Sequence, residues 1–282
     1  MNNHHQEYLD ALFDLVALDD DVSTQEALEI LENRGTFEPL GMAAIYNNIC
    51  VVCLGQGEYT QALQYGLKAK KIYESVLAPE HIDLASCYNN LCVTYLHLDQ
   101  NNDALNYGWK AMEIRRKHLD PEHIDLAISY SNISSALSKL GKPLEALEFG
   151  LKSIKIREKA LDGEHPTIAT SLDTIAAAYL KLGDHKKALA CEREAVEIRE
   201  KSFPPNHPDL AISYHNLATI YYELEDYHSA LDYHLLAYKI QKNTLPANHP
   251  NIGLSYNGIL SAYYKLENGF EWLDTFLADL EE

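Results

Sequence analysis

Five histidines recur at a constant spacing, and imidazole is a side chain that binds metal ions. His81, His123, His165, His207 and His249 each follow the previous one by 42 residues. If each stands once per packed helical unit, equivalent rings lie roughly 10 Å apart, whereas a zinc ion needs its ligands within about 2–2.5 Å of one centre. We therefore expect these histidines to have a structural role at the junctions between units, and we expect no metal site.

Two of the five cysteines form a Cys-x-x-Cys pair, a spacing used in zinc and redox sites. Cys50 and Cys53 stand, however, in a segment whose apolar residues have a helical period, and Cys92 repeats the position of Cys50 after 42 residues. We expect these thiols to pack in a core. An odd number of cysteines without a visible secretory signal favours free thiols in a reducing compartment, and so a cytoplasmic location.

Patterns that would indicate catalysis or a cofactor are weak. Residues 55–60 (Gly-Gln-Gly-Glu-Tyr-Thr) resemble a phosphate-binding loop, but they follow a helical pattern instead of a strand and lack the lysine. The sequence has no Ser/His/Asp arrangement, no paired-carboxylate signature and no nucleotide fingerprint. We expect a protein that is not an enzyme and that uses no cofactor.

The composition narrows the classes of partner. The 282 residues include 42 acidic and 23 basic side chains, a formal net charge of −19. Nucleic-acid phosphates repel such a chain, and no run of apolar residues reaches the ~18 that a membrane helix needs. We therefore expect neither a nucleic acid nor a membrane as the partner.

A repeat of 42 residues organises most of the chain. Counting each junction histidine as repeat position 0, with Pro39 one period earlier, mostly apolar or small residues recur without insertion at positions 7, 10, 11 and 14. This spacing is typical of one face of an amphipathic helix, here termed the A helix. A second helix, the B helix, carries alanine at position 23 for close helix packing: Ala62, Ala104, Ala146, Ala188 and Ala230.

Prolines mark the ends of these helices. Nine of the ten prolines lie at the repeat junctions, and proline is excluded from helix interiors. Each repeat is then a helical hairpin that cannot bury its own apolar face. Stacking of neighbouring hairpins completes the core.

The order of large, Leu/Ile, small and Tyr residues, followed by two alanines, resembles the tetratricopeptide repeat (TPR) signature. Residues 207–211 (His-Pro-Asp-Leu-Ala), 88–91 (Tyr-Asn-Asn-Leu) and 195–201 (Ala-Val-Glu-Ile-Arg-Glu-Lys) are similar to kinesin-light-chain-type repeats, which are longer than the ordinary 34 residues. The resemblance covers residues 39 to about 268. It implies an all-α fold, a right-handed superhelical solenoid of antiparallel helix pairs.

The ends depart from the repeat, and this suggests three regions. Residues 1–38 are expected to form an atypical N-terminal helical cap, with helices at 6–18 and 23–34. Residues 39–248 hold five 42-residue repeats. Residues 249–282 form a sixth, divergent repeat with a C-terminal capping helix, for which docking to another protein is the alternative.

In the family that the sequence resembles, the A helix lines the concave side, so repeat positions 5, 8, 12, 15 and 16 are implied to face inward. Amide side chains there carry donors and acceptors that suit an extended peptide backbone, and solvation alone is the alternative for each residue. The expected peptide-binding residues are Asn47, Asn89, Ser131, Asp173, His215, Asn257, His97, Lys139, Lys181, Tyr222 and Tyr264.

A second asparagine row lies at position 9. Asn48, Asn90, Asn132 and Asn216 are too regular for specificity, so we expect them to form hydrogen bonds between helices.

The sequence therefore predicts a scaffold or adaptor that binds a linear peptide or a partner protein in the concave groove. Lys139 and Lys181 favour a partner with an acidic side chain or a C-terminal carboxylate. Two alternatives stay open. The chain would be a ligand-sensing regulatory domain of a larger signalling protein, or a scaffold that self-associates through Tyr-rich or C-terminal surfaces, although nothing specifically indicates a homo-oligomer.

Overall fold

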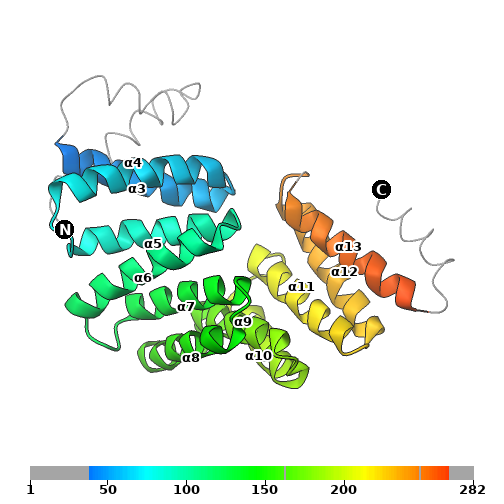
Figure 1. The fold of residues 1–282 in the computed structure, drawn as a ribbon. Coiled ribbons are helices and arrows are strands. Elements are labelled where there is room, and N and C mark those ends of the chain that lie inside the picture. Colours follow the sequence, from blue (N-terminus) through cyan, green and yellow to red (C-terminus); the bar gives the residue numbers. More distant parts are fainter. Residues whose placement is uncertain (1–37, 162, 248, 267–282) are drawn as a thin grey trace. The chain divides into compact units, whose positions relative to one another are not determined.

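The computed structural model describes residues 38–161, 163–247 and 249–266, and this part of the chain is all helical. The A helices are α3 (Pro39–Gln56), α5 (Ile82–His97), α7 (Ile124–Lys139), α9 (Pro166–Lys181), α11 (Pro208–Glu223) and α13 (Pro250–Lys265). The B helices are α4 (Tyr59–Val76), α6 (Asn101–His118), α8 (Pro143–Ala160), α10 (His185–Ser202) and α12 (Tyr227–Thr244) (Figure 1). These antiparallel pairs confirm the predicted fold class. The helices expected at 6–18 and 23–34 and the C-terminal cap lie outside the described residues.

The junction histidines cap the A helices that follow them. The Nδ1 atom of each ring accepts a hydrogen bond from the backbone N–H two residues later, at 3.1–3.3 Å, as at His81 and Asp83. The first N–H groups of a helix have no partner inside it, so an acceptor at this place stabilises the helix start. The 42-residue histidine spacing therefore repeats a helix cap. The five caps are His81, His123, His165, His207 and His249.

The turns between A and B helices need a left-handed residue at one repeated position. Gly57, Gly141 and Gly183 take φ values of 78°, 72° and 76° there, and glycine adopts this conformation without steric cost. Asp99 and Glu225 hold the same place in the other two turns, with φ of 55° and 62°.

The buried residues match the predicted helix faces. The alanines of position 23 are 0% exposed, and the Leu and Ile residues of position 10 are all buried. Tyrosines add a row that was not predicted from the sequence: Tyr65, Tyr107 and Tyr233 on the B helices pack against tyrosines of the A helices, stacked or tilted, at 5.5–6.0 Å between ring centroids. The excess of tyrosine is thus largely a packing feature.

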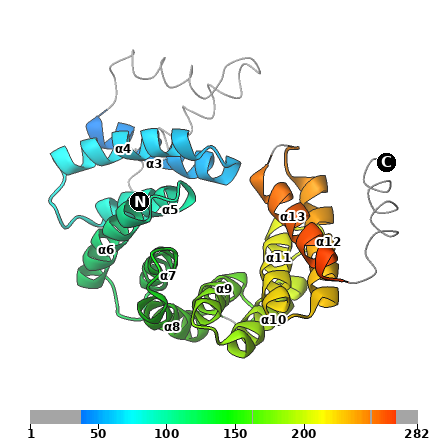
Figure 2. The ribbon, with the colours of Figure 1, turned by 45° about the vertical axis from the view of Figure 1, so that its right-hand side comes forward.

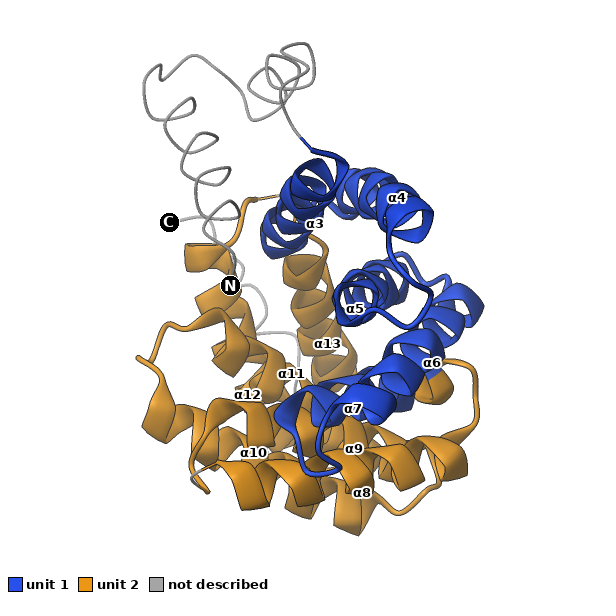
Figure 3. Cartoon of the chain, turned by 90° about the vertical axis from the view of Figure 1, so that its left-hand side faces the viewer, with its two compact units in different colours: residues 1–136 blue, residues 137–282 orange. Residues whose placement is uncertain are grey.

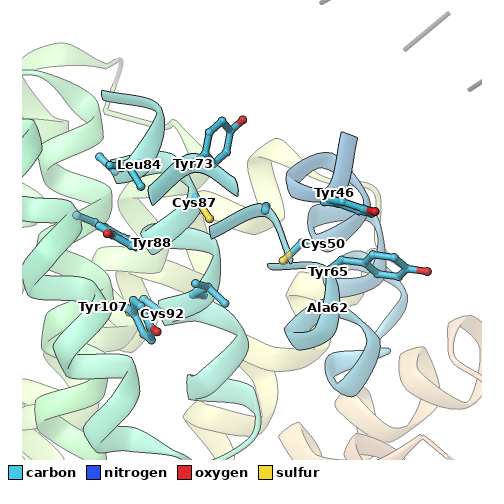
Figure 4. Packing of buried hydrophobic residues seen from close by; sticks show 14 of the residues in the cluster. Tyr46, Cys50, Ala62, Tyr65, Tyr73, Leu84, Cys87, Tyr88, Cys92 and Tyr107 are labelled. Atoms are coloured by element: carbon cyan, nitrogen blue, oxygen red, sulfur yellow. The ribbon is translucent and has the colours of Figure 1, made fainter. Parts of the chain in front are cut away.

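The chain divides into two compact units, residues 1–136 and 137–282, with the boundary inside α7 (Figure 3). In the first unit, Tyr46 and Tyr65 lie side by side, and the nearby Cys50 is part of the same core (Figure 4). Burial raises the pKa of the Cys50 thiol to about 11 and those of Cys87 and Cys92 to about 12. Thiols in this environment stay protonated and are poor nucleophiles.

In the second unit, the pairs α9/α10 and α11/α12 pack in chain order, followed by α13 (Figure 2). In the described part of the chain, no helix combines the length and hydropathy that crossing a lipid bilayer requires.

Candidate functional site

In the first unit, asparagines of neighbouring A helices form a ladder. The Nδ2 group of Asn90 donates to Oδ1 of Asn47 at 3.0 Å, and Nδ2 of Asn132 donates to Oδ1 of Asn89 at 2.9 Å. These bonds confirm the inter-helix role predicted for Asn90 and Asn132. They also engage the carbonyl oxygens of Asn47 and Asn89, which stay half-buried, so the amide N–H groups are the atoms best suited to a partner.

A row of buried arginines was missed by the sequence analysis. Each lies at position 34 of a B helix, is 4–5% exposed, and donates through Nη1 to a serine at position 6 of the next repeat. Both rows have the 42-residue spacing, which is the signal that would have revealed them. The pairs are Arg115 with Ser129, Arg157 with Ser171 and Arg199 with Ser213.

The arginines differ in their charge environment. Arg157 donates to two neutral oxygens, the carbonyl oxygen of Thr167 and Oγ of Ser171, and burial lowers its pKa to about 10. Arg199 instead holds Asp173 with two bonds, Nη1 to Oδ1 at 2.9 Å and Nη2 to Oδ2 at 2.6 Å. Asp173 is therefore tied to a guanidinium and is not a free acid on the surface.

A second carboxyl group lies beside this pair. Glu192 on α10 is 1% exposed, and within the part of the chain that the structure describes its Oε1 atom has no hydrogen-bond partner. Burial raises the pKa of Glu192 well above its ordinary value, and the negative charge of Asp173 raises it further. A buried polar atom without a partner is costly, so it marks a place where a ligand group would be stabilised.

A cavity of about 250 Å³ opens at this carboxyl group. Its apolar wall consists of Ala176, Ala177 and Leu180 of α9 with Ile220 of α11. Its polar wall consists of Asp173, Glu192, His215, Asn216 and Thr219. Two predicted site residues, Asp173 and His215, are thus brought together in one cavity, whereas Glu192, Asn216 and Thr219 were not among the predicted site residues.

A pair of neutral imidazoles follows one repeat later. The rings of His215 and His234 have their centroids 5.0 Å apart, and Nδ1 of His215 lies 3.5 Å from Oγ of Ser255. Burial lowers the pKa of His234 to about 4, and it also lowers the pKa of His215. Both rings are uncharged at neutral pH, so His215 presents a neutral donor or acceptor to the cavity.

None of the other predicted site residues lines this cavity. In the first unit, Ser131 is buried, and the exposed His97 stacks on Tyr59 with ring centroids 4.4 Å apart. In the second unit, Lys181 donates through Nζ to the carbonyl oxygen of Ser138 at 2.6 Å, and Tyr222 contacts Tyr227 edge-on. The remaining three, Lys139, Asn257 and Tyr264, are exposed.

Comparison with known proteins identifies the repeat. The family model of the tetratricopeptide repeat matches residues 41–117, 88–159, 125–201 and 193–243, which together span more than half of the chain. None of the curated proteins matches the sequence significantly.

Solved structures share the fold. The nearly identical TPR-like repeats of a kinesin-light-chain candidate from Podosopora anserina are 26% identical, with a TM-score of 0.56, 71% of this chain covered and 94% of that one. A Rap protein complexed with Competence and Sporulation Factor is 16% identical, with a TM-score of 0.69 and 94% and 74% covered.

NprR in complex with its cognate peptide NprX is also 16% identical, with a TM-score of 0.68 and 99% and 78% covered. At this identity the likeness to the Rap protein and NprR shows the fold alone. Together with the match of the family model, the repeated helix pairs show that the chain belongs to the tetratricopeptide repeat family.

Proposed function

We propose that the protein is an interaction scaffold or adaptor that binds a linear peptide or a partner protein on the faces of its A helices. The observation that carries this proposal is the cavity between α9 and α11, where a buried carboxyl oxygen lacks a partner within the described residues. Membership of the TPR family supports it. Rap and NprR, which share the fold, have been solved with a peptide or factor bound.

The site residues on the A helices supply the contacts in this proposal. Asn47 and Asn89 in the first unit and Asn257 in the second offer amide N–H groups to a peptide backbone. The exposed Tyr264, at 67% exposure, offers an aromatic surface. Lys139 and Lys181 make the protein prefer a partner with acidic side chains. The same proposal has no catalytic step and places the protein in the cytoplasm, where five unpaired cysteines remain reduced.

Titration with fluorescent peptides tests the preference for acidic partners. A Lys139→Glu/Lys181→Glu variant should bind acidic peptides at least tenfold more weakly than the wild type, because it replaces attraction with repulsion. Lys155→Glu/Lys239→Glu, which makes the same charge change on exposed B-helix residues, should bind like the wild type. Equal binding of acidic peptides to wild type and the first variant would show that the lysine role is wrong.

A ligand-sensing regulatory domain remains the second candidate. The observation in its favour is the likeness in fold to NprR, described as a quorum sensor, at 20% identity and a TM-score of 0.64. In this case, peptide binding should change the hydrogen-exchange protection of helices far from the site, whereas a plain adaptor should show protection only at the contact. Sedimentation over a concentration range separates both from self-association.

A further inference from the structure

One position of the B helices changes character along the chain. Successive repeats carry Gly66, Gly108, Gly150, Glu192 and His234 there, each 42 residues apart. A Cβ atom on Gly66 would lie 2.8 Å from Cδ2 of Leu91, and one on Gly108 would lie 3.1 Å from Cγ1 of Ile133. In the first unit a side chain at this position would therefore require Leu91 or Ile133 to shift.

The second unit makes room for one. The facing A helix carries Ala176 and Ala177, where the first two described repeats have cysteine and valine, as at Cys50 and Val51, and the third has two serines. These small residues line the cavity of about 250 Å³, and Glu192 lines it from the B helix. A buried glutamate thus takes the place of glycine where small residues of the facing helix leave a cavity.

When all of them are ionised, the charged groups around the cavity carry a net charge of −1. Asp173 and Glu192 contribute two carboxyl groups, and the guanidinium of Arg199, which is hydrogen-bonded to Asp173, contributes one positive charge. Without a ligand the group becomes neutral when Glu192 keeps its proton, in line with its raised pKa. A monovalent cation would restore neutrality with both carboxylates ionised and would satisfy Oε1 of Glu192.

We propose that the cavity takes up a basic side chain of the bound peptide, with the aliphatic stem of a lysine or arginine along Leu180 and Ile220 and its cationic head at Glu192 and Asp173. This inference rests on the proposed peptide-binding function and names a residue type that the peptide carries. Long basic side chains bury their stems on apolar surface and keep a charged tip, which matches a cavity with one apolar and one acidic wall.

Other ligand classes fit this cavity less well. Two carboxylates repel an anion. In the part of the chain that the structure describes, no group of three His, Cys, Asp or Glu side chains is arranged to hold a metal ion. A neutral apolar side chain would leave Oε1 of Glu192 without a partner, at a cost comparable to a lost hydrogen bond.

Selection of peptides from a random displayed library on the intact chain tests the proposal. The selected peptides should share a lysine or arginine, and changing it to norleucine or citrulline should weaken binding at least tenfold. Glu192→Gln, which removes the charge, should weaken the basic peptide and remove its advantage over the neutral analogue. Ala177→Leu, which fills the cavity, should weaken both peptides. Glu194→Gln and Ala190→Leu, exposed on α10, are the matched controls and should bind like the wild type.

Proton release gives a second readout. Asp173, Arg199 and His215 are the titratable groups that face Glu192 from α9, α10 and α11. In the pH range where Glu192 of the empty protein holds its proton, cation uptake should ionise Glu192 and release up to one proton per peptide, measured by calorimetry in two buffers of different ionisation enthalpy. The Glu192→Gln variant should release none, and equal release by both proteins overturns the proposal.

The outcomes separate this inference from the proposed function. If peptides bind but are indifferent to both Glu192→Gln and Ala177→Leu, peptide binding stands and the cation site is wrong. If no peptide binds the wild type, the proposed function itself fails. Agmatine, a small guanidinium cation, should displace the basic peptide; if agmatine binds and no basic peptide is selected, the ligand is a free cation and the peptide form of the proposal is overturned.

Discussion

The ring of His234 occupies the space that Gly258 leaves empty. A Cβ atom on Gly258 would lie 2.4 Å from Cε1 and Nε2 of His234, closer than any real side-chain contact. Gly258 stands at the repeat position that holds asparagine in four other repeats, and His234 stands where three repeats have glycine. At this contact the B helix carries the large side chain and the A helix carries glycine, so the two departures from the repeat compensate each other.

Gly258→Ala should therefore destabilise the second unit. The added methyl group meets the buried ring of His234, and overpacking of this kind costs about 1–3 kcal/mol in unfolding free energy. Urea unfolding followed by circular dichroism measures the loss. The control is Gly253→Ala in the same helix, where a Cβ meets no atom within 4 Å. Alanine should raise stability there by up to about 1 kcal/mol because it is the better helix former.

The same substitution in a His234→Ala background makes the test specific. With the ring removed, Gly258→Ala should be neutral or stabilising, so that the two changes show a large coupling energy. A loss of the same size in both backgrounds would show that the close contact with His234 is not the cause.

The pH dependence of stability should report on His234. Its folded-state pKa of about 4 lies below the ordinary value of 6.5, so the unfolded chain binds more protons between these values. The contribution of His234 to stability should then fall as the pH is lowered from 6.5 to 4, by up to about 3 kcal/mol, and this group should contribute no change above pH 7. His234→Phe keeps an aromatic ring without titration and should remove most of this slope, as seen in urea unfolding at a series of pH values. An unchanged slope contradicts the assignment to His234.

The fold was predictable because its signals are periodic. Position 10 and position 23 are buried in every described repeat because helix packing imposes the same small or aliphatic residues each time. The histidine spacing indicated the junctions, although the capping bond of Nδ1 required the structure. The boundary between two units inside α7 has no counterpart in the repeat pattern, so the sequence analysis did not anticipate it.

The site was only partly predictable, because it depends on exceptions to the repeat. Asp173 and His215 were found as variable residues on an A helix. Glu192 was missed because it lies on a B helix. The B helices were recognised by their alanines, and the site residues were sought on the A helices. Arg199 was missed because a repeated arginine suggests an exposed charge, whereas its serine and aspartate partners come from two other helices. Glu192 and His234 replace the glycine that the earlier repeats have at the same position of the B helix. Comparison of the repeats at this position would have located the cavity.

Removal of a histidine cap should weaken the helix that it begins. Nδ1 of His81 accepts from the N–H of Asp83 at 3.2 Å, and loss of such a cap typically costs about 0.5–2 kcal/mol. His81→Ala should lower the midpoint of thermal unfolding, while His81→Ser, which supplies another capping oxygen, should retain most of the stability. His228→Ala, on an exposed residue of α12, is the control. Equal losses for alanine and serine at position 81 would argue against the cap as the source of stability.

Glu192→Gln should stabilise the protein at high pH while it removes the proposed cation site. Burial raises the pKa of Glu192 above its ordinary value of 4.5, so the folded state holds this proton more tightly than the unfolded state does. The contribution of Glu192 to the stability of the wild type should then fall as the pH rises above 4.5, until the folded-state pKa is passed. Glutamine does not titrate, so the variant should gain on the wild type across this window, with about 2–4 °C in unfolding midpoint for each kcal/mol.

The quantity to compare is the difference in unfolding midpoint between the Glu192→Gln variant and the wild type, because His234 changes stability in the opposite direction below pH 6.5. Thermal unfolding at pH 4.5, 6 and 8 measures this difference. Glu194→Gln, exposed on the same helix, is the control and should show no pH-dependent difference. A gain for Glu192→Gln that is the same at all three values would mean that the carboxyl group is not held protonated by burial. A gain that grows with pH, together with loss of basic peptides, indicates an acid that destabilises the empty protein and is used in binding.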